Sequence, residues 1–196
     1  MGLLQRDTQR HTYGDYLHWP EDIRYELIDG IAYAMTAPTR RHQEILLELA
    51  RQVANALQGH PCRPFIEPFD VRLPKGEEAD QDIDTVVQAN LCVVCDPQKL
   101  DERGCRGAPD WVVEVLSPAT AGHDHILKRA VYERAGVREY WLVHPVDRIV
   151  TVYRLEGSRF AVPEVRELEG KQAVGVLPGV EIDWGSFAGL LGPKEL

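Results

Sequence analysis

The chain has 196 residues, of which 44% are hydrophobic and 27% are charged, so it is long enough to bury a core without staples. Its formal net charge of −9 disfavours general nucleic-acid binding through a basic surface, because neutralising phosphates requires clustered cations. The apolar stretches fall far short of the ~20 residues of a membrane span, and the N-terminus lacks the apolar segment of a signal peptide. We therefore expect one soluble, cytoplasmic domain over residues 1–196, with no membrane partner.

Apolar runs predict the strands, and four-residue apolar repeats predict the helices. Asp29-Gly30 favours a type I′ turn between two strands, and Thr36 or Thr39 is expected to cap the first helix. Continuous apolar runs at 85–95 and 111–116 are typical of strands covered on both faces. In chain order the expected elements are strands at 23–28 and 31–35, a helix from about Pro38 to Leu57, strands at 65–73, 85–95 and 111–116, a helix at 124–135, and strands at 139–143 and 149–155, with further short strands to about 183.

This order of elements belongs to the α/β class. One mixed sheet with helices packed against it buries the apolar faces most economically. The four cysteines are expected to be free, buried thiols. Cys92 and Cys95 have the spacing of a metal or redox pair, but residues three apart on a strand point to opposite faces.

Several familiar sites are disfavoured by details of their pattern. The acidic loop at 77–84 lacks the glycine and the final glutamate of a calcium loop, so we expect it to be solvated. Ser117 has no nucleophile elbow around it, and the chain has no glycine-rich phosphate loop. His123 and His125 lie two residues apart, which favours a surface or helix-start position over metal ligation.

Glu114 is harder to dismiss, because it lies inside an apolar strand where charges are seldom buried without a partner, a metal or a raised pKa. A structural ion pair with an arginine is one explanation. Lys128, one of only five lysines, is the natural alternative, although it could instead pair with Asp124 within its own helix. Asn90 lies on the preceding strand and meets Glu114 if the two strands are neighbours.

Three segments together resemble a known family. Residues 25–30 (YELIDG), 112–118 (VVEVLSP) and 136–143 (GVREYWLV) look like the Uma-two family of restriction-type endonucleases, in the PD-(D/E)XK nuclease superfamily. The similarity runs from about Thr12 to Val180. It implies a restriction-endonuclease-like core of helix, three strands, helix and strand, with an added N-terminal hairpin and added C-terminal strands.

The resemblance also implies chemistry, namely hydrolysis of DNA phosphodiester bonds that depends on Mg²⁺, with Mn²⁺ as a possible substitute. The metal ligands would be Asn90, Glu114 and the main-chain carbonyl of Val115. Lys128 matches the lysine that orients water or phosphate, and Glu26 matches a recurrent glutamate that can reach the site. A homodimer is expected by analogy, because cutting both strands usually takes two sites.

One departure from the family pattern leaves a second function open. The family's Pro-Asp is Ala89-Asn90 here, so an amide oxygen replaces a charged ligand. A unit charge about 4 Å from another is worth roughly 4 kcal/mol at an effective dielectric of 20. The alternative is therefore a nuclease-fold protein with weakened or lost catalysis that acts as a binding or assembly module.

Overall fold

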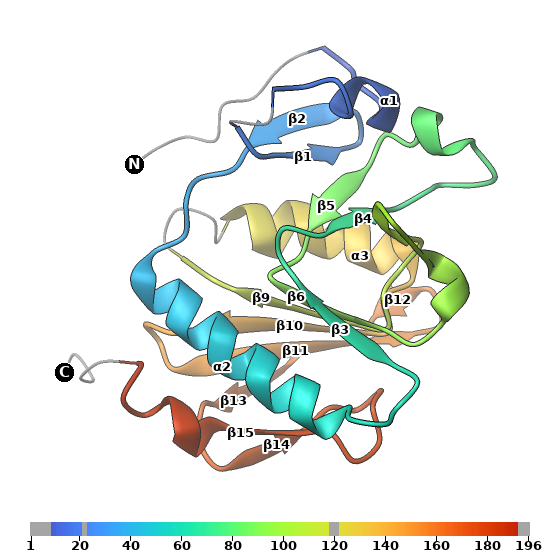
Figure 1. Cartoon of the computed structure of the whole chain (residues 1–196). Helices are drawn as coiled ribbons and strands as arrows, with labels where there is room; N and C mark the ends of the chain where they lie inside the picture. The colour runs from blue at the N-terminus through green and yellow to red at the C-terminus, as the bar shows by residue number, and fades with distance from the viewer. Residues whose placement is uncertain (1–8, 21–22, 118–121, 192–196) are drawn as a thin grey trace.

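The computed structural model describes residues 9–20, 23–117 and 122–191 and confirms the α/β class (Figure 1). The expected single sheet is wrong, because the strands divide between a six-stranded sheet, a seven-stranded sheet and a two-stranded ribbon. The strand order in the six-stranded sheet is β2-β1-β5-β4-β8-β7. The strand order in the seven-stranded sheet is β12-β11-β10-β9-β6-β3, and β13 also pairs with β11. The first sheet contains β1 (Tyr25–Ile28), β2 (Ile31–Ala34), β4 (Asp70–Arg72), β5 (Val86–Gln88), β7 (Leu100–Asp101) and β8 (Gly104–Arg106).

The seven-stranded sheet lies at the centre of the molecule, between helices. Its β9 and β10 are parallel, whereas its other strand pairs are antiparallel. Its strands are β3 (Arg63–Ile66), β6 (Leu91–Val94), β9 (Trp111–Val115), β10 (Glu139–His144), β11 (Ile149–Glu156), β12 (Arg159–Phe160) and β13 (Glu164–Glu167), and the ribbon is β14 (Lys171–Ala173) with β15 (Glu181–Asp183). The helices are α1 (Tyr13–Tyr16), α2 (Arg40–Ala56), the π-helical η3 (His123–Lys128) and α3 (Arg129–Ala135), with short 3₁₀ turns η1 (Asp80–Asp82), η2 (Pro97–Lys99) and η4 (Trp184–Phe187).

Two predicted strands are each split between the two sheets. The run at 65–73 divides into β3 and β4, since Pro68 has no N–H to continue a ladder. The run at 85–95 divides into β5, which pairs with β1 and β4, and β6, which pairs with β3 and β9. Both halves are buried inside their sheets, so the apolar pattern continues through the break. Ala89 and Asn90 therefore form a link between sheets.

The hairpin and the first helix confirm their predictions. Asp29 and Gly30 have φ of 49° and 79°, the two positive values that a type I′ turn requires. Thr39 is the cap of α2, and its side chain accepts a hydrogen bond from the His42 N–H. Pro38 lies before this cap rather than inside the first turn.

Alternation along β9 decides which helix each side chain meets. Trp111, Val113 and Val115 pack into the cluster that includes the apolar face of α2 and the C-terminal segment. Val112 packs on the opposite side with residues of α3. Glu114 shares the face of Val112, so the sheet directs its carboxylate towards α3.

The second predicted helix begins in a different form. Residues 123–128 make a π-helix and only 129–135 are α-helical, ending at Gly136 with φ of 89°. Lys128 lies at the change between the two, a place where π-helical turns often serve a site. Pro118 and the side chain of Asp124, both used above, lie outside the described part of the chain.

The expectation of free thiols is wrong for two of the four cysteines. Cys62 and Cys95 form a disulfide, whereas Cys92 and Cys105 are free and buried. Arg63 pairs with Val94 across β3 and β6, so the two bonded cysteines are the next pair along the ladder. The sequence could not show this pairing, because the partners are 33 residues apart. Cys92 and Cys95 do diverge as predicted, since they pack into different clusters.

Replacing Cys62 and Cys95 together by alanine is expected to lower the free energy of unfolding by about 3 kcal/mol, because the unfolded chain loses its cross-link. Urea unfolding of the wild type with and without reductant measures this effect. The double variant is the control, since reductant should leave its midpoint unchanged. Equal midpoints for the oxidised wild type and the variant would contradict the prediction.

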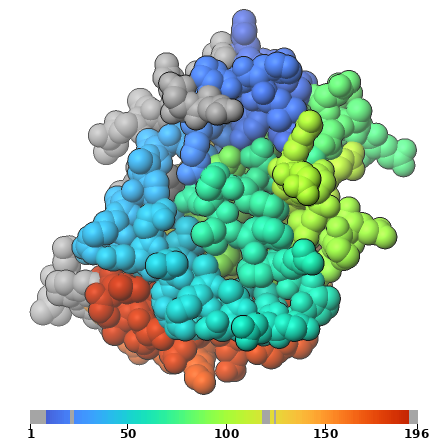
Figure 2. Space-filling view, in the orientation of Figure 1, coloured from blue at the N-terminus to red at the C-terminus, as the bar shows by residue number. Residues whose placement is uncertain are grey.

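Within the described residues, no helix combines the length and the apolar character needed to cross a bilayer. Figure 2 shows the N-terminal segment at one end of the molecule and the C-terminal segment at the other, with α2 between them.

Candidate functional site

Three charged side chains, one from each of the two large sheets and one from the end of η3, are buried together. Glu26, Glu114 and Lys128 are 3%, 1% and 2% exposed. They come from β1 and from β9 and the end of η3, which follow one another much later in the chain. Buried charges of this kind are normally found only with close partners, so their contacts define the cluster.

Lys128 lies at the centre of this cluster. Its Nζ is 2.6 Å from Glu114 Oε1 and 2.9 Å from Glu26 Oε1. It also donates to the main-chain carbonyl of Gln88 at 3.2 Å. An ammonium group has three protons, so these three oxygens match its full donor capacity. The lysine therefore joins β1, β5 and β9.

Glu114 is held by neutral donors as well as by the lysine. The Tyr132 hydroxyl donates to Glu114 Oε1 at 3.0 Å, and the Asn90 N–H donates to Oε2 at 3.2 Å. Burial, followed by the nearby Glu114 and Glu26 carboxylates, raises the pKa of Tyr132 well above its ordinary value, so this hydroxyl stays a donor. Glu114 therefore pairs with Lys128, the alternative to an arginine partner.

Glu26 is the second buried carboxylate. Its Oε1 accepts the Gln88 N–H at 2.8 Å, and its Oε2 lies 3.0 Å from His123 Nε2. Burial raises the pKa of Glu26, but Lys128 and His123 lower it by more, to about 2. The carboxylate therefore stays ionised throughout the neutral range.

The pH dependence of stability should report this low pKa. The folded-state pKa of Glu26 is below the ordinary 4.5, so its stabilisation is complete above that value and is lost as the pH falls towards 2. A shift from 4.5 to about 2 corresponds to about 3 kcal/mol. Urea unfolding of the wild type and Glu26→Gln should differ by about this amount at pH 6 and converge at pH 2. A constant difference would contradict the assignment.

Asn90 reaches the cluster from the link between the sheets. Its Oδ1 accepts the Val115 N–H at 2.7 Å and lies 3.1 Å from His42 Nε2. His42 is 9% exposed, and its Nδ1 is buried without a hydrogen-bond partner among the described residues. The fold thus brings Glu114, Lys128, Glu26 and Asn90 together.

Sequence reasoning missed His42 and the main chain of Gln88. A usable signal for His42 existed, because it stands three residues before Ile45 on the apolar face of α2, where a polar side chain needs an explanation. The two histidines of η3 diverge: His123 contacts Glu26, whereas the His125 ring lies 5.1 Å from that of His144. The two rings therefore contact different residues.

The acidic loop has a structural use that the expectation of a solvated loop missed. Asp80 pairs with the fully buried Arg72 and, at 2.9 Å, with Arg106. Lys75 pairs with Asp84 at 2.7 Å. The loop carboxylates therefore neutralise Arg72 and Arg106 of the six-stranded sheet and Lys75, which precedes the loop.

Magnesium can be tested against these donors. In the described residues no three or more His, Cys, Asp or Glu side chains are grouped as a metal site. The oxygens of Glu26, Glu114 and Gln88 around Lys128 are nevertheless the hard donors that Mg²⁺ prefers. Two buried carboxylates meet here, beside the Lys128 ammonium group and the His123 ring. The donor set fits Mg²⁺ in the chemistry of its oxygens.

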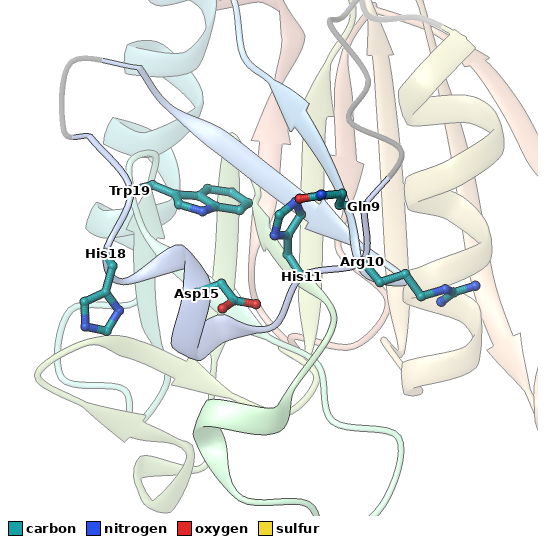
Figure 3. A pocket seen from close by; sticks show the side chains of 6 residues that line it. All are labelled: Gln9, Arg10, His11, Asp15, His18 and Trp19. Carbon is teal, nitrogen blue, oxygen red and sulfur yellow. The ribbon is translucent and has the colours of Figure 1, made fainter.

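A hollow of about 730 Å³ lies elsewhere, against the N-terminal segment (Figure 3). It is lined by Gln9, Arg10, His11, Asp15, His18 and Trp19. None of the residues expected at the site lies in it.

The family model Uma2, described as "Putative restriction endonuclease", matches residues 13–185. The chain belongs to the Uma2 family. A solved relative, a crystal structure of a "putative nuclease belonging to DUF820" from Anabaena variabilis, superposes with a TM-score of 0.71. It is 21% identical and covers 92% of this chain and 98% of its own, so it shows a shared fold. An "Uncharacterized protein slr1290" from Synechocystis sp. is 29% identical over 142 residues, or 71% of each chain.

Proposed function

We propose that this Uma2 protein is an endonuclease that hydrolyses DNA phosphodiester bonds with Mg²⁺, or Mn²⁺ in its place. The observation that supports it is the convergence of two buried carboxylates on one buried lysine, Glu26 and Glu114 on Lys128, beside Asn90. Membership of the Uma2 family supports DNA as the substrate. Buried, ionised groups in this arrangement are more typical of catalytic sites than of ion pairs that stabilise a fold, because removing charges from water costs free energy.

Glu114 and Glu26 would hold the cation, with Asn90 and the carbonyl of Val115 as further oxygen ligands. When bound, Mg²⁺ stabilises charge on the phosphate and lowers the pKa of water. Tyr132 and the Asn90 N–H keep Glu114 oriented by donating to its two oxygens. The ionised Glu26 retains its charge at neutral pH because its pKa is about 2.

Lys128 would turn its ammonium group from a carboxylate to a phosphate oxygen. Its contacts with Glu26 and Glu114 hold the nitrogen in place before substrate arrives. An ammonium group aimed at a phosphate is strongest in a site that excludes water, as the 2% exposure of this lysine favours.

The proposal also includes a cellular location and an oligomeric state. The enzyme would act in the cytoplasm. It would act as a homodimer, since cutting both strands of a duplex usually takes two sites related by a two-fold axis.

Plasmid cleavage tests the proposal. Purified wild type should nick or linearise supercoiled plasmid, or cut single-stranded DNA, in Mg²⁺ or Mn²⁺ and not in chelator. Glu114→Gln should abolish cutting, whereas Glu156→Gln at an exposed position of β11 should not. Cleavage that persists in Glu114→Gln would contradict the proposed site.

A second function is favoured by one specific observation. Both lone pairs of the Asn90 oxygen are used by hydrogen bonds, and Lys128 uses its donors within the protein. Such a closed network suits a nuclease-fold protein that binds DNA or another partner without cutting it. Cleavage that appears only in Asn90→Asp would support this alternative.

A further inference from the structure

The side-chain amide of Asn90 has one orientation that its neighbours allow. The Val115 N–H lies 2.7 Å from the atom placed as Oδ1, and a main-chain N–H can only donate. Exchanging the oxygen and the NH₂ group would set two donors against each other in a site with 9% exposure. The oxygen therefore faces β9.

This orientation decides the proton position on His42. The same Asn90 oxygen lies 3.1 Å from His42 Nε2, and an oxygen in this orientation can only accept. His42 Nε2 must then carry a proton. Nδ1 is buried with no partner in the described residues, so a proton there would have no acceptor. Leaving Nδ1 as a lone pair is the less costly state.

We infer that His42 is a positioning residue of the site: as the Nε2–H tautomer it fixes the Asn90 oxygen between α2 and β9 and competes with a cation for it. The competition follows from the acceptor count. An amide oxygen has two lone pairs, and the donors of Val115 and His42 use both. The His42 bond is the longer of the two, so it is the one that a cation would displace. The competition between His42 and a cation rests on the proposed function.

Imidazole NMR tests the tautomer without metal or substrate. Long-range ¹H–¹⁵N spectra of the metal-free wild type at pH 7.5 should show His42 with its proton on Nε2 and a bare Nδ1. The loss of one signal set in His42→Gln assigns the residue among the seven histidines. A proton on Nδ1 would overturn the inference.

Binding of Mn²⁺ alone, measured by calorimetry, tests the competition. His42→Phe removes the donor while keeping a planar ring, and should tighten Mn²⁺ binding about fivefold, the equivalent of one neutral hydrogen bond. His42→Gln can still donate an amide N–H and should bind Mn²⁺ like the wild type. Unchanged affinity in His42→Phe, or equal tightening in His42→Gln, would overturn the inference.

A third comparison separates this inference from the proposed function. In an Asn90→Ala background the His42→Phe effect should vanish, because the shared oxygen is gone. A persistent effect would mean that His42 acts by another route and would overturn the inference. If no variant binds Mn²⁺, Asn90→Asp included, the cation-dependent function fails, while the NMR result decides separately whether His42 positions Asn90.

Discussion

Lys128→Met is expected to lower the free energy of unfolding by about 4 kcal/mol. Removing one partner of a buried ion pair leaves uncompensated charge, which typically costs about 3–5 kcal/mol. Here the substitution leaves Glu26 and Glu114, each no more than 3% exposed, without the ammonium group between them. Urea unfolding at pH 7 measures the loss. The exposed Lys171→Met on β14 is the matched control and should change stability by less than about 0.5 kcal/mol.

A triple variant separates charge from packing. Combining Lys128→Met with Glu26→Gln and Glu114→Gln removes the unpaired charges but keeps the shapes of the side chains. If the unpaired charges, rather than lost packing, cause most of the destabilisation in Lys128→Met, the triple variant should recover more than half of the lost stability. A triple variant no more stable than Lys128→Met would show that packing, rather than neutralisation, explains the role of the lysine.

Asn90→Asp is expected to tighten Mn²⁺ binding at least about a hundredfold. An added carboxylate about 4 Å from a cation gains roughly 4 kcal/mol per unit charge at an effective dielectric of 20. Part of this gain is offset by repulsion from Glu114, whose Oε2 accepts the main-chain N–H of Asn90 at 3.2 Å. Calorimetry with Mn²⁺ measures the affinity of each protein.

Asn55→Asp makes the same chemical change on the exposed face of α2 and should leave Mn²⁺ affinity unchanged. Equal affinities for Asn90→Asp and Asn55→Asp would remove Asn90 from the proposed ligand set. Plasmid cleavage by the same two variants extends the comparison. Cutting that both the wild type and Asn90→Asp perform favours an active enzyme, whereas cutting gained only in Asn90→Asp favours the binding module.

Local and periodic features of the fold could be predicted from the sequence. The Asp29-Gly30 turn, the apolar face of α2 and the burial of β9 all depend on residues close together in the chain. The division into two sheets could not be predicted, because apolar residues stand on both sides of the break at Ala89 and Asn90. The disulfide of Cys62 with Cys95 depends on strand pairing in the same way.

In the candidate site, too, residues with a local signal could be predicted and residues placed by long-range contacts could not. Glu114 was conspicuous because a charge interrupts an apolar strand, and Lys128 lies on the helix that follows it. The proximity of Glu26 came from family resemblance, since nothing local links β1 to β9. His42 was missed because its role depends on the Asn90 side chain, which faces it only after the chain crosses between sheets.

Iron-directed backbone cleavage tests most directly whether the Lys128 cluster holds a cation. Fe²⁺ in place of Mg²⁺, with ascorbate and peroxide, cuts polypeptide close to where it binds. If the cluster holds a cation, we expect cuts near Glu26, Asn90 and Glu114 that excess Mg²⁺ suppresses and Glu114→Gln abolishes. Cuts confined to other segments, or unchanged in Glu114→Gln, would contradict the proposed cation site.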